Sequence, residues 1–428
     1  MGTQWRWFLK DMVKQLWFRA TVFSLVGVLS ALLAIAFKDY VPEGLSMAVG
    51  SDAVDKILGI LASSMLAVTT FSLSTMVTAY GSTSSGVTPR ATTLMMEDST
   101  TQNALATFIG SFLFSLVGII ALSTGVYGNQ GRVLLFGVTI AVIVVIVYTL
   151  LRWIDYLSRL GRIGDTIDLV EHATVTAIER RNEQPTMGAS PYPATLPEGL
   201  QLVASPETGY LQFVDVKALS AVAQQQGLAI YVPVVPGSFV AQGEPLAYVQ
   251  LATGPNPDQS HDQDLEKRVR LAFTLGVRRV FEHDPRFGLA VLSEIASRAL
   301  SPAVNDPGTA IDVIGRGVRT LGRWGRETPG ESHATSLCSN VFMPSLEVAD
   351  LFEDFFSPIA RDGAALIEVS VRLLKALGSL ARMNPEFSSV AARQAAHVLS
   401  YSDHALVLDE EKQTLRRLVS DLGLSGQR

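Results

Sequence analysis

Four long apolar stretches occupy the first third of the chain, at residues 18–37, 57–80, 103–126 and 133–151. About twenty helical residues cross a hydrocarbon core about 30 Å thick, so each stretch is long enough to span a membrane. Apart from Arg19, at the start of the first stretch, none of them contains Asp, Glu, Lys, Arg or His. The pattern therefore predicts four transmembrane helices.

After the fourth stretch the pattern changes to that of a folded soluble domain. Apolar positions at three- and four-residue steps extend the fourth helix to about Arg181. Short strand patterns follow, with a turn at residues 236–238, and helical patterns dominate the rest. The predicted fold class is a membrane α-helical domain followed by a cytoplasmic α+β domain with a small β unit and a helical bundle.

We divide the chain into four regions: a four-helix transmembrane domain at 1–152, a juxtamembrane helix and linker at 153–198, a β-rich unit at 199–252 and a mainly helical domain at 253–428. The helices expected in the last region lie near 287–300, 309–322, 346–356, 363–383, 388–400 and 408–422. We expect residues 400–403 to break the helix between His397 and His404. The β-rich unit resembles half of a lipoyl-type module, but its only lysine, Lys217, lies at a predicted helix start, so no prosthetic group is expected.

The second apolar stretch differs from the others because it is rich in hydroxyl side chains. One side of this helix collects a hydroxyl stripe made of Ser63, Thr70, Ser74 and Thr78, with Ser64 and Thr75 beside them. Lipid offers these groups no partner, so the stripe should face protein or water, or bond back to its own helix. Helix packing is the favoured interpretation, and a hydroxyl-lined permeation path is the alternative. A matching stripe on the third helix, Ser111, Ser115 and Gly118, is expected to meet it.

Composition and charge agree with this division. The chain is 48% hydrophobic and 17% charged, against about 25% charged residues in a typical soluble protein. Residues 1–152 carry 9 Lys and Arg against 7 Asp and Glu, whereas residues 153–428 carry 25 against 33, a net charge of −8. Nucleic acid is not an expected partner of so acidic a domain. Without ionisable groups inside the apolar stretches, a proton-coupled pump is not expected either.

Flanking charges predict the orientation, because cytoplasmic flanks are enriched in Lys and Arg. Basic residues precede the first stretch and follow the fourth: Arg6, Lys10, Lys14 and Arg19, then Arg152, Arg159 and Arg162. Both termini are therefore expected in the cytoplasm, and the loops at 39–55 and 128–132 on the other side. The single cysteine, Cys338, fits a reducing compartment.

One motif in the helical region breaks a helix and starts another. Ser301 and Pro302 end the first helix, because the residue before proline avoids the α region. The motif continues with Asn305 or Asp306 as the cap of the next helix, Pro307 in its first turn and Thr309 after it. Arg298 could pair with Asp306 across the break. From these residues alone, the motif is an ordinary corner between two helices.

Residues 298–310 and the preceding segment 282–288, which contains Asp284, resemble the signature of a bacterial membrane-protein family known as domain of unknown function 2254. Further similar segments lie at 64–65, 88–90, 209–212 and 235–240, in the same order. The chain departs mildly from the pattern at Gly308 and Thr88. The resemblance implies the architecture and a bacterial inner membrane, and it implies no reaction or substrate.

Enzyme chemistry is not expected, because the chain has no GxSxG, HExxH, Walker or dinucleotide-binding motif. The six histidines show no metal-ligand spacing, so neither metal nor cofactor is predicted. Two functions remain open. One is a homo-oligomeric channel-like or solute-permeation protein with a cytoplasmic sensing domain. The other is a membrane scaffold or signalling protein whose cytoplasmic domain docks a partner.

Overall fold

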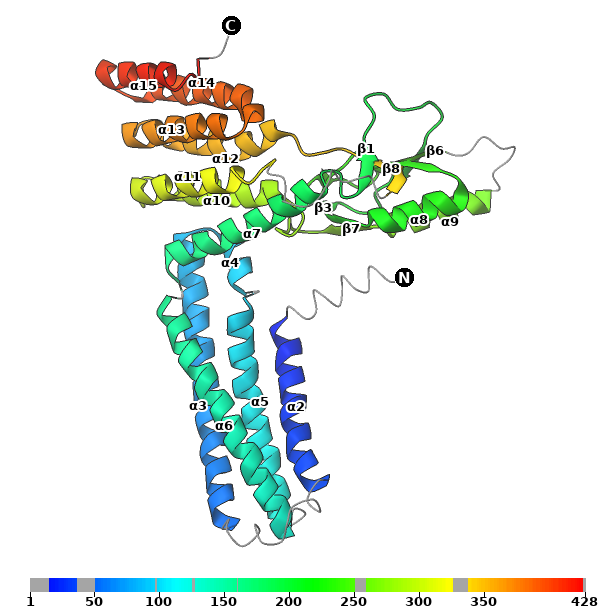
Figure 1. Ribbon diagram of the computed structural model, residues 1–428, viewed down its shortest axis with the longest axis vertical. Helices are drawn as coiled ribbons and strands as arrows, with labels where there is room; N and C mark the ends of the chain where they lie inside the picture. Colours follow the sequence, from blue (N-terminus) through cyan, green and yellow to red (C-terminus); the bar gives the residue numbers. More distant parts are fainter. Residues whose placement is uncertain are drawn as a thin grey trace. The chain divides into compact units, whose positions relative to one another are not determined.

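The computed structural model describes residues 15–36, 51–96, 98–124, 128–159, 161–250, 259–325 and 338–425 (Figure 1). The chain forms two compact units, Met1–Thr166 and Ile167–Arg428. Unit 1 is helical and carries the apolar stretches. Unit 2 contains two small sheets and a stack of helices.

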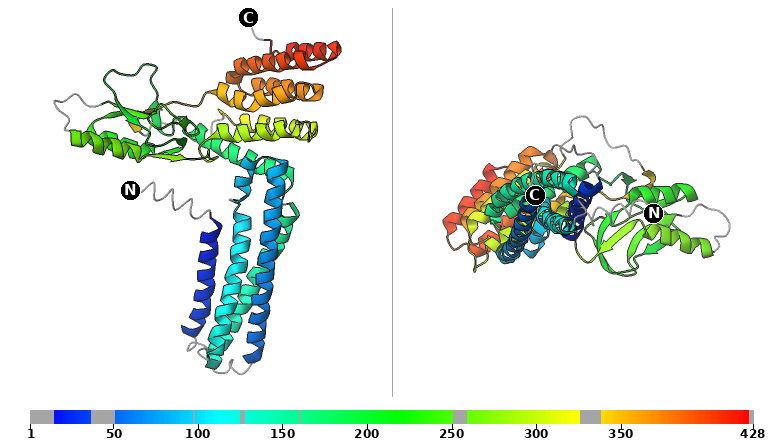
Figure 2. Two further views of the ribbon diagram at one scale, coloured as in Figure 1. Left: turned by 180° about the vertical axis from the view of Figure 1, so that it is seen from behind. Right: turned by 90° about the horizontal axis from the view of Figure 1, so that it is seen from below.

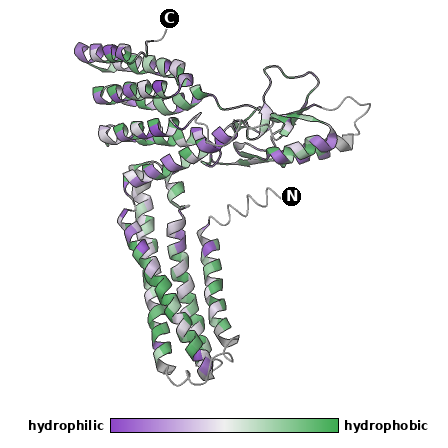
Figure 3. Cartoon of the chain, in the orientation of Figure 1, coloured by the Kyte–Doolittle hydropathy of each residue, from purple (hydrophilic) through white to green (hydrophobic). Residues whose placement is uncertain are grey.

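Long apolar helices make up unit 1: α2 (Leu16–Ala36), α3 (Ser51–Gly86), α5 (Ser99–Ser123) and α6 (Gly128–Arg159), with the short α4 (Pro89–Met96) between α3 and α5. Much of these helices is coloured green in Figure 3, which marks hydrophobic residues. Within the described residues, α3, α5 and α6 each hold a span long and apolar enough to cross a membrane, and α2 holds a shorter apolar segment, Trp17–Leu33. The chain therefore has several membrane-spanning candidates at the predicted places.

Helix α5 lies at the centre of unit 1 and packs against α2, α3 and α6. Small residues allow this packing, as is usual where membrane helices approach closely. A Cβ placed on Gly27 would lie only 2.7 Å from the Gly110 carbonyl oxygen, so α2 and α5 cross at a pair of glycines. Ser111 and Ser115 of α5 are buried.

The fourth apolar helix does not run unbroken to Arg181, as the apolar pattern had predicted. Helix α6 ends at Arg159, and α7 (Ile163–Glu183) begins after a break that contains Gly161 at φ +86°. This backbone conformation is open to glycine and interrupts any α-helix. The apolar face of α7 is nevertheless used as expected, because Ile167, Val170 and Ala177 are buried.

Two small sheets form one end of unit 2. Their strands are β1 (Ala189–Pro191), β2 (Gln201–Ala204), β3 (Gly209–Val214), β4 (Ala229–Tyr231), β5 (Phe239–Val240), β6 (Pro245–Gln250), β7 (Phe273–Gly276) and β8 (Cys338–Met343). One sheet has the order β1-β8-β4-β6-β2 and the other β5-β3-β7. Helices α8 (Val216–Gln226) and α9 (Gln259–Arg270) add apolar residues to the same core, including Leu219 and Val269. Segments outside 199–252 thus complete both sheets.

Three antiparallel helix pairs form the rest of unit 2, and we call them the hairpin array. The pairs are α10 (Pro285–Ala299) with α11 (Pro307–Leu321), α12 (Val348–Asp362) with α13 (Ile367–Met383), and α14 (Ser388–Ala405) with α15 (Asp409–Asp421). The pairs stack as layers, so that α10, α12 and α14 form one row and α11, α13 and α15 the other (Figure 2). Buried phenylalanines such as Phe352, Phe355 and Phe387 fill the space between layers.

The predicted helices of this region are confirmed, with one correction. Helix α14 continues through residues 400–403, where a break was expected, and ends at Ala405. Ser402 is buried there, and its hydroxyl lies 2.9 Å from that of Ser370 on α13. Tertiary packing therefore outweighs the weak helix preference of Ser, Tyr and Asp. His397 and His404 share this helix, and both are exposed.

Candidate functional site

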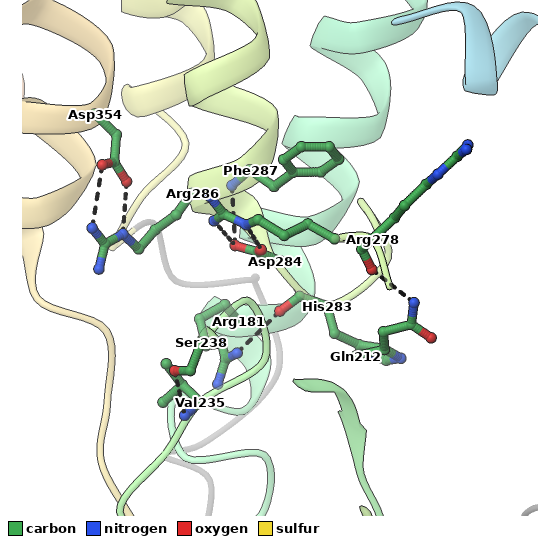
Figure 4. A network of polar contacts seen from close by, with 11 residues as sticks. Arg181, Gln212, Val235, Ser238, Arg278, His283, Asp284, Arg286, Phe287 and Asp354 are labelled. Carbon is green, nitrogen blue, oxygen red and sulfur yellow. Dashed lines mark hydrogen bonds and ion pairs between the residues drawn. The ribbon is translucent and has the colours of Figure 1, made fainter. Parts of the chain in front are cut away.

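A network of polar contacts in unit 2 surrounds Asp284, which caps the start of α10 (Figure 4). Its side chain is almost fully buried. Arg279 donates two hydrogen bonds to the carboxylate, at 2.7 Å and 2.9 Å, and the Phe287 backbone N–H donates a third at 3.0 Å. Burial raises the pKa of Asp284 above its usual value of 3.8, and the hydrogen bonds from Arg279 oppose this rise.

A tight turn from the β-rich unit closes over this carboxylate. Gly237 stands at φ +98°, and a Cβ at this position would overlap the Asp284 carboxylate. The turn is fixed to β3, because the Gly237 N–H donates to the Leu211 carbonyl at 2.7 Å and the Leu211 N–H donates to the Ser238 carbonyl at 2.9 Å. Three segments of the family resemblance, at 209–212, 235–240 and 282–288, therefore meet at one place.

Arg181, from the end of α7, is a second buried charge of this region. Its guanidinium donates to the His283 carbonyl at 3.2 Å and to the Pro185 carbonyl at 3.4 Å. Burial lowers the pKa of Arg181 to about 10, and the negative charge of Asp284 opposes this. Arg181 thus ties α7 to the segment that leads into α10.

Arg286, two residues after Asp284, joins α10 to α12. Its guanidinium makes a two-point contact with Asp354, at 2.6 Å and 3.2 Å, and a further bond of 2.6 Å to Asp350. A planar guanidinium matches two carboxylate oxygens, which makes this the strongest geometry available to such a pair. We call Arg181, Arg279, Asp284, Arg286, Asp350 and Asp354 the Asp284 cluster.

The arrangement of the cluster is that of a structural junction. Its carboxylates accept hydrogen bonds from arginines of the same chain, so they are oriented toward protein groups. Across the described residues, His, Cys, Asp and Glu form no group of three or more that could hold a metal ion. The chemistry of the cluster is therefore charge pairing of Arg279 with Asp284 and of Arg286 with Asp350 and Asp354, together with the bonds from Arg181 to backbone carbonyls.

The corner motif lies at the other end of α10, so the structure separates it from Asp284. Helix α10 has 15 residues, which is about 22 Å of helix. Asp306 caps α11 as predicted: the Thr309 N–H donates to its carboxylate at 3.0 Å and the Thr309 hydroxyl at 2.5 Å. Pro307 occupies the first turn of α11. These bonds lower the pKa of Asp306, led by the one from the Thr309 hydroxyl.

Two other features of the corner differ from the sequence expectation or add to it. The Asp306 carboxylate accepts from Thr309 rather than from Arg298, so the proposed pair across the break is not formed among the described residues. Ser301 accepts the Asn305 N–H at 2.8 Å through its carbonyl, and Asn305 stands at φ +50°. Pro302 and Asn305 are exposed. The turn is thus held by its own backbone bonds.

The hydroxyl stripe of α3 lies on the outer side of the bundle. Ser63, Thr70, Ser74 and Thr78 are exposed, and Ser64 and Thr75 are partly so. Five of the six hydroxyls donate to backbone carbonyls of their own helix. Ser74 supplies one of these carbonyls, which accepts the Thr78 hydroxyl at 3.0 Å. The buried face of α3, with Leu58, Met65 and Ser72, is on the opposite side.

The expectation that this stripe meets Ser111, Ser115 and Gly118 within the chain is therefore wrong. Gly118 instead faces Leu58, whose Cδ1 would lie 3.0 Å from a Cβ at that position. The hydroxyl that α3 does bury belongs to Ser72, which accepts a 2.9 Å hydrogen bond from the Trp153 indole of α6. Packing or permeation at the stripe would involve a second chain.

Sequence reasoning singled out Asp284 but missed Arg181 and Arg279. Arg279 is five positions before Asp284, a spacing that no helix or strand period brings together, because a bend of the chain turns it back. Arg181 gave only the signal of a charged residue on the apolar side of a helix. A charged residue on an apolar helix face can point to a buried site, because a buried arginine needs hydrogen-bond acceptors nearby.

The comparisons with known proteins agree with this architecture. A family model described as "Predicted membrane protein (DUF2254)" matches residues 13–379. The chain belongs to this family. The match covers both units, from α2 into α13, and confirms the resemblance drawn from the motifs.

Two relatives within curated proteins show the same level of similarity. An uncharacterized protein of Mycobacterium tuberculosis strain H37Rv and one of Mycobacterium bovis are each 28% identical over 227 residues. These residues are 51% of this chain and 42% of the relative, so the match spans less than half the length of these relatives. No solved structure matches the chain.

Proposed function

We propose that this membrane protein of the DUF2254 family is a membrane-anchored docking protein, in which the hairpin array presents the binding surface. The observation that supports this most is the stack of three helix pairs, α10 to α15. Stacked helix pairs form extended surfaces that bind other proteins. Many functions share one architecture, and crosslinking in cells tests this function directly.

The proposed anchor has four membrane crossings, α2, α3, α5 and α6, with both termini in the cytoplasm of a bacterial cell. Support comes from the basic residues Arg19, Arg152 and Arg159 at one end of the helices, since cytoplasmic flanks are rich in Lys and Arg. We propose that copies associate through the outward hydroxyl stripe of α3. Small and hydroxyl residues let membrane helices approach closely.

We also propose that the protein acts without catalysis. Acidic side chains of the Asp284 cluster are engaged by arginines: Asp284 by Arg279, and Asp354 by Arg286. A general acid or base must reach its substrate, and these carboxylates are committed to internal pairs.

Photo-crosslinking in cells tests the docking function. A photoreactive residue at Glu353 on α12 or Ser389 on α14, both exposed, should give a discrete adduct with another protein. The same residue at Glu198, which is exposed outside the array, serves as the matched control and should give none. Absence of adducts from every array position would contradict docking.

A second candidate is a solute-permeation protein, and the observation that favours it is the exposed hydroxyl stripe of α3. Such a path would lie between copies, where hydroxyls replace part of an ion's hydration shell. Purified protein in liposomes separates the candidates. Docking predicts no ion or osmolyte flux above that of empty liposomes.

If wild-type liposomes do show flux, permeation becomes the function, and Ser74 is the residue to change. Ser74→Leu should then reduce flux by narrowing the path, while the matched variant Ser74→Ala removes the hydroxyl without adding bulk. Under docking, Ser74→Leu should instead weaken association of the copies, at a cost of about 1–3 kcal/mol by analogy with soluble cores. Size-exclusion chromatography in detergent measures that association.

A further inference from the structure

Helix α11 carries a ladder of charged side chains on one face. On the helix Asp312 is followed by Arg316 and Arg319, at steps of four and three residues, and Arg323 comes four residues later, in the turn just after the helix ends at Leu321. These steps place side chains in a row along one face of a helix. The Arg316 side chain is held in place on this face, because its Nε donates a hydrogen bond to Asp312 at 2.8 Å.

The ladder of α11 is occupied by an acidic helix of the same chain, α7. Glu171 receives two bonds from Arg319, at 2.8 Å and 2.9 Å, and one from Arg316 at 3.0 Å. Asp168 also pairs with Arg316, and Glu179 lies 4.0 Å from Arg323. The structure thus shows what this pattern of cations binds: carboxylates at intervals along a helix.

Helix α13, in the next layer of the array, repeats the pattern of α11. Glu368 is followed by Arg372, Lys375 and Ser379, again at steps of four, three and four residues. Arg382 supplies the cation at the third step, since its guanidinium donates to the Ser379 hydroxyl at 3.3 Å. The two helices are neighbours in the same row: a Cβ on Gly315 of α11 would lie 3.0 Å from the Arg372 guanidinium.

The cations of α13 differ from those of α11 in forming no ion pairs with a neighbouring helix among the described residues. Arg372, Lys375 and Arg382 are exposed, and no ion pair joins any of them to another described residue. This is unusual for the region, because residues 153–428 carry 33 acidic against 25 basic side chains. We call these three residues the α13 basic face.

We propose that the α13 basic face binds an acidic helix of a partner protein, in the way that α11 binds α7. The proposal deepens the docking function above and rests on it. Charge complementarity defines the partner: carboxylates spaced as in α7, where Asp168, Glu171 and Glu179 follow at steps of three and eight residues. Complementary charges give such contacts their specificity and their salt dependence.

A peptide that copies residues 163–179 is the probe, because this part of α7 contains four acidic and no Lys or Arg side chains. Fluorescence anisotropy measures its binding to the full-length protein in nanodiscs of zwitterionic lipid. The peptide should bind and be released by salt. Charge reversal at Arg372, Lys375 and Arg382 together should weaken binding at least about tenfold.

The matched control reverses three exposed cations elsewhere in unit 2, Lys267, Arg393 and Arg417, and should leave binding unchanged. A peptide with Asn and Gln in place of Asp and Glu should not bind. If charge reversal perturbs folding, judged by circular dichroism, the Gln versions of the same three residues replace it.

Three results would overturn the proposal: no binding to the wild-type protein, equal losses in both triple variants, or a loss that follows Arg319→Glu and not the α13 changes. The last result would place the peptide on α11. Each of these results leaves the crosslinking test of docking intact, so failure of this inference is distinguishable from failure of the proposed function.

Discussion

A single glycine decides whether the turn at 235–238 can close over Asp284. Gly237 has both a left-handed backbone and no room for a side chain, because the Asp284 carboxylate occupies the place of its Cβ. The sequence shows a Pro-Gly-Ser turn and a capping aspartate 47 positions later. It does not show that the two touch, since that contact depends on the path of the chain between them.

Gly237→Ala should therefore destabilise the region by about 2–5 kcal/mol, from about 1–2 kcal/mol of backbone strain and about 1–3 kcal/mol of overpacking. Gly243→Ala is the matched control, because Gly243 stands at φ +90° with no atom within 4 Å of a Cβ. Gly243→Ala should destabilise the protein only by the backbone strain, about 1–2 kcal/mol. Hydrogen exchange of the start of α10, measured on the full-length protein, compares the two. Equal losses would show that the Asp284 contact is unimportant.

Asp306 tests the capping role of the corner motif. Asp306→Ala should cost about 0.5–2 kcal/mol at neutral pH, the usual value of a lost cap, because no pair with Arg298 is broken. The pKa of Asp306 is lowered in the fold, so its contribution is present above the ordinary value of 3.8 and is lost as the pH falls through the folded-state pKa. The difference in unfolding midpoint between wild type and variant should shrink in that acid range. A loss well above 2 kcal/mol would indicate a buried ion pair instead.

At the scale of elements, the starts of α10 and α11 were predictable because local chemistry defines them. Asp284 and Pro285 start α10, and Asp306 and Pro307 start α11, each with a side-chain cap and a proline in the first turn. The break expected in α14 was wrong because burial of Ser402 is a long-range effect. Local signals therefore define helix starts better than they define helix continuity.

The contact between α7 and α11 also belongs to this scale, and two of its glutamates differ sharply. Glu171 is 15% exposed and bonds two arginines, whereas Glu179 is 52% exposed and lies 4.0 Å from one. Glu171→Ala should cost about 1.5–3 kcal/mol, as expected for charged hydrogen bonds, and Glu179→Ala about 0–1 kcal/mol. Hydrogen exchange of α7 in the full-length protein measures both. Similar small effects would show that apolar packing alone holds α7.

At the scale of the whole molecule, the division into an apolar helical unit and an acidic domain followed from composition alone. The sheets did not, because the sequence of β8 carries no information about its partners. Residues 338–343 pair with β1 and β4, from more than a hundred positions earlier. Similarly, the outward direction of the hydroxyl stripe follows from the packing of α3, which a helical period alone cannot orient.

The orientation across the membrane is a prediction at this scale. With Cys338 replaced by Ser, a cysteine at Ser51 should react with an impermeant thiol reagent on intact cells, and one at Ser389 should not. Positive flanking charge is the physical reason. Ser389 is suitable for the second label because it is exposed on α14. Labelling at position 389 and not at position 51 would contradict the predicted topology and indicate the opposite orientation.

The strand order of the five-stranded sheet has a consequence for biosynthesis. Strand β8 lies between β1 and β4, yet Ala189 pairs with Cys338, which is 149 positions later in the chain. At about 5–20 residues per second, a ribosome needs roughly 7–30 seconds to make that stretch. For this time β1 waits with an open hydrogen-bonding edge, and β4 waits for the shorter time that its 111-residue separation from β8 requires; open edges are sites for mispairing. The nascent chain is therefore most exposed to aggregation, and most dependent on chaperones, just before residue 343 leaves the ribosome.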